Sequence, residues 1–227
     1  VESVRFSAGG FDAQYGDKLS SVLDITYKTP NTFKASLMAS LLGAEAHIEQ
    51  ATSERFNYIV GARYRSNGYL LNALPTQGSY NPVFTDAQIS TNFKLTDELT
   101  WSTLLHYSSN NYRFSPETSE TDFGTANEAY SFKIYFDGQE QTKFETMMGG
   151  ISLKWKPSEK TNLDLYATAF QTTEREYFDI QGQYFINELE TDPSKEEYGD
   201  SIAVLGIGTF LNHARNRLDA TIINIYH

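Results

Sequence analysis

Cysteine is absent from the 227-residue chain. Its absence excludes a disulfide framework, thiolate metal ligands and a cysteine nucleophile, but leaves the compartment open because many exported chains also lack cysteine. Cationic residues are scarce as well: 18 Lys and Arg stand against 29 Asp and Glu, so the formal net charge is −11. Nucleic-acid binding rests on clustered cationic side chains, and a chain this acidic is therefore a poor candidate for it.

Long hydrophobic runs are also missing. No apolar stretch approaches the roughly 20 residues of a membrane-spanning helix, and the first residues, Val1 to Phe6, do not have signal-peptide architecture. Aromatic residues are nevertheless abundant, at 14%, while the mean hydropathy is −0.46. The fold has to explain a chain that is rich in aromatic residues and polar at the same time.

Apolar and polar residues alternate with a period of two over most of the chain, which is the spacing of a β-strand. In residues 56–65, for example, Tyr58, Val60 and Ala62 share one row, whereas Asn57 and Arg63 belong to the other. None of the six prolines falls inside an alternating segment, as expected for strands. About nine strands are predicted in this way, at Phe33–Leu41, Gly43–Gln50, Phe56–Arg65, Phe84–Leu95, Leu99–Phe114, Lys143–Lys156, Asn162–Phe178, Ile202–Asn212 and Arg217–His227.

Short and long connections alternate between these strands. Tight turns are predicted at 96–98, 157–160 and 213–216, and long connections at 66–80, 115–142 and 180–201. All tight turns would then lie at one end of the sheet and all long loops at the other. This is the pattern of an outer-membrane β-barrel, with short periplasmic turns and long extracellular loops.

The apolar rows favour contact with lipid over a soluble core. They contain no charged residue, they include Thr, Ala and Gly, and aromatic residues such as Tyr64, Trp101 and Trp155 lie towards their ends. A soluble core would favour densely packed Val, Ile and Leu, whereas a lipid-facing band tolerates small residues and has aromatic girdles at both interfaces. The opposite rows hold Asn, Ser, Gln, Lys, Arg, Asp and His, so we expect that face to be wet.

The predicted fold class is therefore all-β, an antiparallel up-and-down transmembrane β-barrel. Bacterial single-chain barrels have an even number of strands and must close, so that no edge meets lipid. Nine strands cannot meet both conditions, and the chain stops within a strand. We therefore expect a fragment of a longer protein.

A glycine-rich leader precedes the predicted strands. On spacing alone it is an ordinary turn before a strand, and it lacks the Lys-Ser/Thr ending and the following helix of a phosphate-binding loop. With the Thr26-Tyr27-Lys28 that follow, however, it resembles the C-terminal end of the plug domain of TonB-dependent outer-membrane receptors. It departs from that family at Gln14, where the family commonly carries Arg, so a plug-to-barrel ion pair at that position is in doubt. The leader reads Gly9-Gly10-Phe11-Asp12-Ala13-Gln14-Tyr15-Gly16-Asp17-Lys18-Leu19-Ser20-Ser21-Val22-Leu23-Asp24-Ile25, and its motif residues are Gly9, Gly10, Tyr15, Gly16, Ser20 and Val22.

The resemblance implies that the chain contains parts of two domains. Residues 1–29 would end a plug domain, and residues 30–227 would form the N-terminal portion of a barrel of roughly 22 strands whose lumen holds the plug. The implied protein is no enzyme and needs no cofactor. It imports a scarce nutrient, such as a siderophore, cobalamin, an oligosaccharide or a peptide, across the outer membrane of a Gram-negative bacterium. The periplasmic protein TonB would pull on plug residues that precede Val1.

Five residues are candidates for ligand contact. Arg63 and Arg65 are expected to face the lumen, where they meet either an anionic ligand or, as we favour, carboxylates of the plug. Phe123, Tyr130 and Tyr135 belong to the long connection 115–142, where they either stack on a ligand or extend a hairpin above the membrane.

Metal binding is not favoured by any spacing in the sequence. The acidic connection 180–201 offers the oxygen ligands that suit Ca²⁺, but it matches no EF-hand loop, and we favour a solvated acidic loop. His47, His106, His213 and His227 share no metal-ligand spacing.

Two other function classes stay open. A soluble or secreted all-β module, such as a glycan-binding sandwich, would use the loop aromatics to stack on its ligand. A β-sandwich glycosidase would need an acid–base pair, and none of the many carboxylates is singled out by the sequence.

Overall fold

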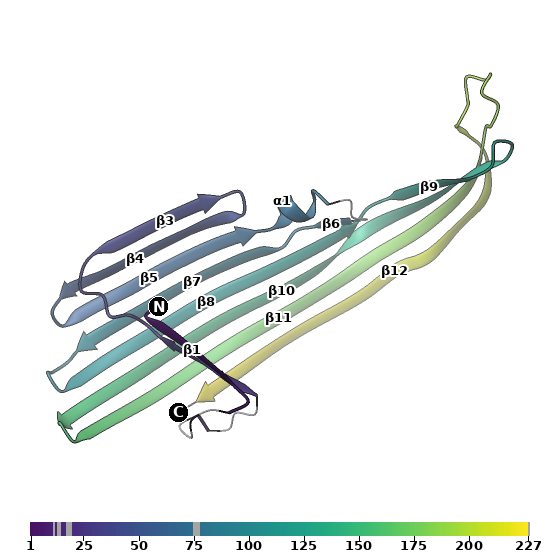
Figure 1. Ribbon diagram of the computed structural model, residues 1–227. Coiled ribbons are helices and arrows are strands. Elements are labelled where there is room, and N and C mark those ends of the chain that lie inside the picture. The colour runs from purple at the N-terminus through teal and green to yellow at the C-terminus, as the bar shows by residue number, and fades with distance from the viewer. Residues whose placement is uncertain (11, 13–14, 17–19, 75–77, 227) are drawn as a thin grey trace.

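The computed structural model describes residues 1–10, 12, 15–16, 20–74 and 78–226. It is all-β, with antiparallel strands and one short helix, α1 (Gly68–Leu71). Strands β1 (Ser3–Ala8) and β2 (Ser21–Thr26) form a two-stranded sheet. The other strands form one ten-stranded sheet (Figure 1). They are β3 (Lys34–Ser40), β4 (Gly43–Ser53), β5 (Phe56–Ser66), β6 (Gly78–Tyr80), β7 (Val83–Lys94), β8 (Leu99–Pro116), β9 (Ser119–Gly124), β10 (Ala129–Ser158), β11 (Thr161–Leu189) and β12 (Ser201–Tyr226).

Each long strand of the large sheet pairs with its neighbour in sequence. The order is β3-β4-β5-β7-β8-β10-β11-β12, while β6 pairs with β8 and β9 pairs with β10. Every pairing is antiparallel. Within the described residues β3 and β12 do not pair with each other, so this is an up-and-down sheet with two open edges.

The predicted alternation of short and long connections is confirmed. Residues 54–55, 95–98 and 159–160 make short turns at one end of the sheet. The described parts of the connections 67–82, 117–128 and 190–200 lie at the other end, where α1, β6 and β9 are found (Figure 1). The two-residue link between β3 and β4 is the exception, since it joins strands at the long-loop end.

The predicted tight turn at 213–216 is wrong. Strand β12 runs without interruption through this segment, with Arg215 opposite Asp179 and Asn216 opposite Phe178. Strand β11 offers a backbone partner on both sides of this segment, with a shift in register between Ala214 and Leu211, and that ladder outweighs the turn-like composition. The predicted strands at 202–212 and from 217 onward are therefore one strand, and the large sheet has eight strands in its main path instead of nine.

Two of the predicted long loops are partly β-structure. Most of 115–142 belongs to the ends of β8 and β10 and to β9, which leaves residues 117–118 and a turn at 125–128. Of the predicted loop 180–201, residues 180–189 continue β11 and residue 201 begins β12, which leaves a loop at 190–200. Strands β10, β11 and β12, which flank these loops, extend well past β3, β4 and β5 at the long-loop end (Figure 1).

The large sheet is not covered by a hydrophobic core. Among the described residues, Ile180 is the one buried hydrophobic side chain, whereas large apolar side chains such as Leu37 (80% exposed) and Ile225 (75% exposed) are open on the surface. Apolar surface on this scale is unusual for a soluble monomer and marks a surface that contacts membrane or another protein.

Candidate functional site

The strand register gathers the predicted apolar rows on one surface, which we call the uncharged face. Ile48, Val60, Ile89 and Leu105 are consecutive cross-strand partners on β4, β5, β7 and β8, and partners directly opposite each other project to the same side of a sheet. The face consists of alternate residues in the ranges 35–39, 44–48, 58–64, 87–93, 99–107, 147–155, 163–171 and 223–225, none of which is charged.

The uncharged face has the height of a membrane-spanning band. On β10 it runs from Met147 to Trp155, which is roughly 27 Å of strand at about 3.4 Å per residue. This matches the roughly 9–11 residues that a tilted transmembrane strand needs. Phe93 and Trp101 are cross-strand partners near the turn end, while Tyr107 lies near the loop end, so aromatic residues flank the band on both sides.

The opposite surface, the polar face, carries hydrogen-bonded side chains. Asn92 Nδ2 donates to Asn57 Oδ1 at 2.9 Å, and Ser102 Oγ donates to Asn92 Oδ1 at 2.7 Å. These residues link β5, β7 and β8 on the side away from the uncharged face. A network of this kind suits a surface in contact with water or with polar protein.

The segment after β2 lies against the polar face. Lys28 pairs with Glu49 of β4, and Tyr27 is hydrogen-bonded to Gln88 of β7. Glu49 is only 2% exposed, and His47 Nε2, at 3.3 Å, adds to its partners. Burying a carboxylate costs free energy unless opposite charges compensate for it. This cluster therefore holds the segment after β2 against the sheet.

Arg63 and Arg65 lie on the polar face, as predicted. Arg63 Nε donates to Asp86 Oδ2 of the adjacent strand β7 at 2.8 Å. Asp86 is the direct cross-strand partner of Arg63, and side chains that lie opposite each other in this way are close enough to pair. The pairing of Arg63 with carboxylates of the plug stays a prediction. Arg63 and Arg65 both line a groove of about 410 Å³, together with His106 and Asn110.

The three aromatic candidates stack within the extended hairpin instead of lying in an open loop. The Phe123 and Tyr130 ring centroids are 5.7 Å apart across β9 and β10, and Tyr135 meets Phe185 of β11 edge-on at 5.2 Å. The structure shows that the hairpin is extended here, whereas stacking on a ligand stays a prediction. Phe123 and Tyr135 are nevertheless 52% and 41% exposed.

An ion pair stabilises the same hairpin. Lys133 Nζ lies 2.9 Å from Glu120 Oε2. The hydrogen bond from Lys133, together with one from Ser131, lowers the pKa of Glu120, and the same contact with Glu120 raises the pKa of Lys133.

The acidic loop 190–200 is ordered by its own contacts. Lys195 Nζ lies 2.5 Å from Glu190 Oε2, and this hydrogen bond lowers the pKa of Glu190. Asp192 accepts hydrogen bonds from the hydroxyl and backbone N–H of Ser194, which lower its pKa as well. Within the described ranges, no group of three or more His, Asp and Glu side chains is arranged to hold a metal ion.

The residues of the plug-like motif lie in the connection of the β1–β2 hairpin and at the start of β2. Gly9 has a φ of 79°, which favours glycine, and its N–H donates to the Ser20 carbonyl at 3.3 Å. Val22 pairs with Ser7 in the sheet, and the Tyr15 hydroxyl donates to Asp24 Oδ2 at 2.6 Å. Gly10 and Gly16 lie in the connection, whereas Gln14 and residues 11, 13 and 17–19 are outside the described residues.

Sequence reasoning missed a set of charges that continues the uncharged face towards the long loops; we call it the charged belt. Arg175 Nη1 lies 3.5 Å from Glu145 Oε2, and Arg175 Nε lies 3.8 Å from Asp219 Oδ1. The signal was available, because Glu145 and Lys143 keep the odd parity of the apolar row that starts at Met147. The belt consists of Arg113, Lys143, Glu145, Arg175, Asp179, Arg215, Arg217 and Asp219.

No helix in the described part of the chain is long and apolar enough to cross a membrane. Comparison with family models, curated proteins and solved structures finds no match for the chain.

Proposed function

We propose that the chain is part of a TonB-dependent outer-membrane importer. Residues 30–227 would be the N-terminal portion of its transmembrane barrel, closed by further strands, and residues 1–29 would be the end of its plug. The observation that carries the proposal is the uncharged face, an exposed apolar surface without a single charge across eight consecutive strands. A lipid bilayer is the environment that such a surface fits, because a Lys or Arg at its centre costs about 2–4 kcal/mol.

The contacts of the leader segment support a plugged lumen. Lys28 and Tyr27 bind the polar face, on the side opposite the uncharged face. If the uncharged face meets lipid, the polar face lines the lumen, and a segment on that face is inside the barrel. A ligand that binds the plug and the loops can then shift the plug between two states by binding one state more tightly.

The ligand would enter from the side of the long connections. There strands β9, β10 and β11 present the exposed ring of Phe123, and the groove beside Arg65 lies on the polar face. These two places differ in chemistry: the ring stacks on apolar or sugar surfaces, whereas the guanidinium binds anions. The nutrient classes that remain are siderophores, cobalamin, oligosaccharides and peptides.

The soluble binding module is supported less well. A β-sandwich buries residues of two facing sheets, whereas one hydrophobic side chain is buried among the described residues here.

Uptake by whole cells tests the proposal. Cells that lack or carry the full-length gene would be given a labelled ferric siderophore, cobalamin, oligosaccharide and peptide, with and without a protonophore and with and without TonB. We expect one ligand to accumulate only when the gene, the proton gradient and TonB are all present. Accumulation of none of the four, or accumulation that needs neither the gradient nor TonB, would contradict the proposal.

A further inference from the structure

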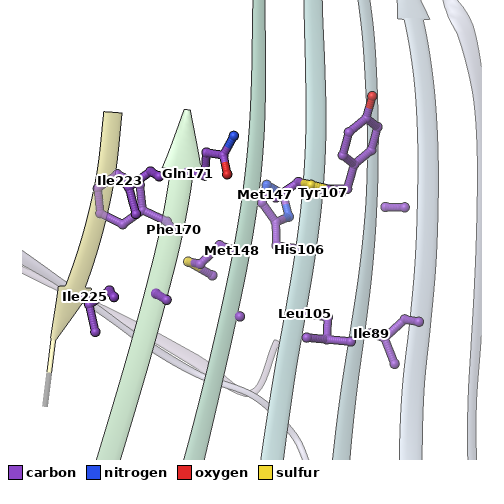
Figure 2. Close-up of a pocket in the computed structure, with 13 residues that line it drawn as sticks. Ile89, Leu105, His106, Tyr107, Met147, Met148, Phe170, Gln171, Ile223 and Ile225 are labelled. Carbon is purple, nitrogen blue, oxygen red and sulfur yellow. The ribbon is translucent and has the colours of Figure 1, made fainter. Parts of the chain in front are cut away.

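The uncharged face is hollowed between β8 and β12. Gly149 of β10 and Ala169 of β11 are cross-strand partners, and the next partners outward are Leu105 and Ile225. Because the central pair has little or no side chain and the flanking pair is large, the surface sinks into a depression of about 540 Å³. Figure 2 shows Leu105 on one side of this depression and Ile225 on the other. The flanking strands are roughly 14 Å apart, or three strand spacings, so the depression can hold an extended hydrocarbon chain.

The charged belt begins directly beyond this depression. On β10, Glu145 follows Met147 on the same side of the strand, and Lys143 comes next. Lys143 is six residues from Gly149, roughly 20 Å along the strand. The belt contains five cations and three carboxylates, a local excess of positive charge in a chain whose net charge is −11.

Carboxylates hold the belt cations in fixed positions while leaving their outer sides open. Arg217 Nη2 lies 2.8 Å from Asp219 Oδ2, and Arg215 Nε lies 2.9 Å from Asp179 Oδ2. The side chains of Arg175 and Arg217 are nevertheless 57% and 76% exposed. With Lys143 and Asp219 they line a groove of about 330 Å³. A guanidinium that is already oriented retains free N–H groups whose fork matches a phosphate group.

From this arrangement we propose that the belt and the depression together bind one phosphate-bearing lipid of the membrane that has a net negative charge. Its phosphate would contact Lys143, Arg175 and Arg217, and one of its acyl chains would lie over Gly149 and Ala169. The proposal rests on the proposed function, since the sheet meets such a lipid only if its uncharged face is in a bilayer. It adds a site of defined chemistry to a surface that would otherwise contact lipid without preference.

Native mass spectrometry of the full-length protein in detergent micelles tests the site. The probes are bisphosphorylated lipid A, phosphatidylcholine and inorganic phosphate. We expect lipid A to bind, phosphatidylcholine to bind much more weakly because it lacks net negative charge, and inorganic phosphate to bind weakly because it has no acyl chain. Equal affinity for lipid A and phosphatidylcholine would overturn the proposal, and so would phosphate binding as tight as that of lipid A.

Two variants separate the parts of the site. Replacing Arg175→Gln and Arg217→Gln together should weaken lipid A binding by about tenfold or more, because charge-assisted hydrogen bonds to phosphate are lost. Gly149→Leu fills the depression and should weaken the binding of lipid A but not that of phosphate. A Cβ at position 149 would lie 3.5 Å from Leu105 Cδ2, an ordinary van der Waals contact. The control is Lys94→Gln with Lys154→Gln, which removes two cations from the polar face and should leave lipid A binding unchanged.

The outcomes distinguish this site from the proposed function. Suppose that the wild-type protein imports its ligand and that all variants insert into membranes. If the arginine variant then binds lipid A as tightly as the wild type, or the lysine control loses as much lipid A affinity as the arginine variant, the lipid site is wrong and the importer stands. If the wild-type protein folds in water without detergent or lipid, the proposed function is wrong.

Discussion

A charge placed at the centre of the uncharged face should be costly, and the cost should depend on depth. Ile151 lies four residues from Met147 and four from Trp155, roughly 13 Å along the strand from each end of the band. Ile151→Arg therefore puts a guanidinium near the bilayer midplane, where the cost is about 2–4 kcal/mol. Since ~1.4 kcal/mol is a factor of ten, the unfolding equilibrium constant should rise by about 30-fold to 700-fold. Met147→Arg, beside the charged belt, should cost only about 0–1 kcal/mol.

The assay is an equilibrium urea titration of the full-length protein in phosphatidylcholine vesicles, read by the gel shift between folded and unfolded forms. The matched control is Ser152→Arg, one residue further along β10 and on the polar face. It should be destabilised much less than Ile151→Arg. Equal losses for these two variants, or a loss at Met147 as large as that at Ile151, would refute the reasoning that this face meets lipid.

Three further predictions concern other parts of the chain. Glu49→Gln removes the carboxylate that holds Lys28, so trypsin should cleave after Lys28 several-fold faster in the membrane-inserted protein. The control Glu45→Gln, on the same strand, should leave the cleavage rate unchanged. An unchanged rate in the Glu49 variant would show that other contacts hold the segment after β2. In urea titration, Gly138→Ala should lower the free energy of unfolding by at least about 1 kcal/mol more than Gly149→Ala does. Gly138 has a φ of 100°, and a Cβ added there would lie 2.0 Å from the Asp179 carbonyl oxygen. Similar losses in the two variants would contradict this prediction. The Glu190 pKa is lowered in the folded loop, so its pairing with Lys195 stabilises the loop above the carboxyl's ordinary pKa and is lost as pH falls through the lowered value. Hydrogen exchange at Gly199, whose N–H donates to the Glu190 carbonyl, should therefore lose protection at acidic pH after correction for the intrinsic rate, and Lys195→Met should lose it already at neutral pH; protection independent of pH and of this variant would rule the coupling out.

Much of the sheet could be predicted from the sequence because its strands are half-exposed. A strand such as β10 shows strict alternation over Met147 to Trp155, which no helix would share, and the register then follows from short turns such as 95–98. The segment 213–216 misled the prediction because its polar composition resembles a turn, while the partner that keeps it extended is β11, distant in the sequence. Composition reports local preference, and pairing over a long hairpin overrides it.

The candidate sites were less predictable, since they depend on which side chains become neighbours. Parity placed Arg63 on the correct face, but its partner Asp86 is fixed by the pairing of β5 with β7. The charged belt draws on β8, β10, β11 and β12, so no single strand reveals it. The contact between Lys28 and Glu49 likewise joins segments that the sequence pattern treats separately.

The most direct test of the central claim is the accessibility of each residue of β10 from 147 to 155. Because the chain has no cysteine, single cysteines can be introduced and spin-labelled in the full-length protein in vesicles, after removal of any cysteine elsewhere in that protein. Collision rates with oxygen, which is enriched in lipid, and with a water-soluble nickel chelate would then be measured by electron paramagnetic resonance. The account predicts alternation with a period of two, in which labels at 149, 151 and 153 meet oxygen and labels at 148, 150 and 152 do not. Nickel accessibility at 151 equal to that at exposed loop positions would contradict it.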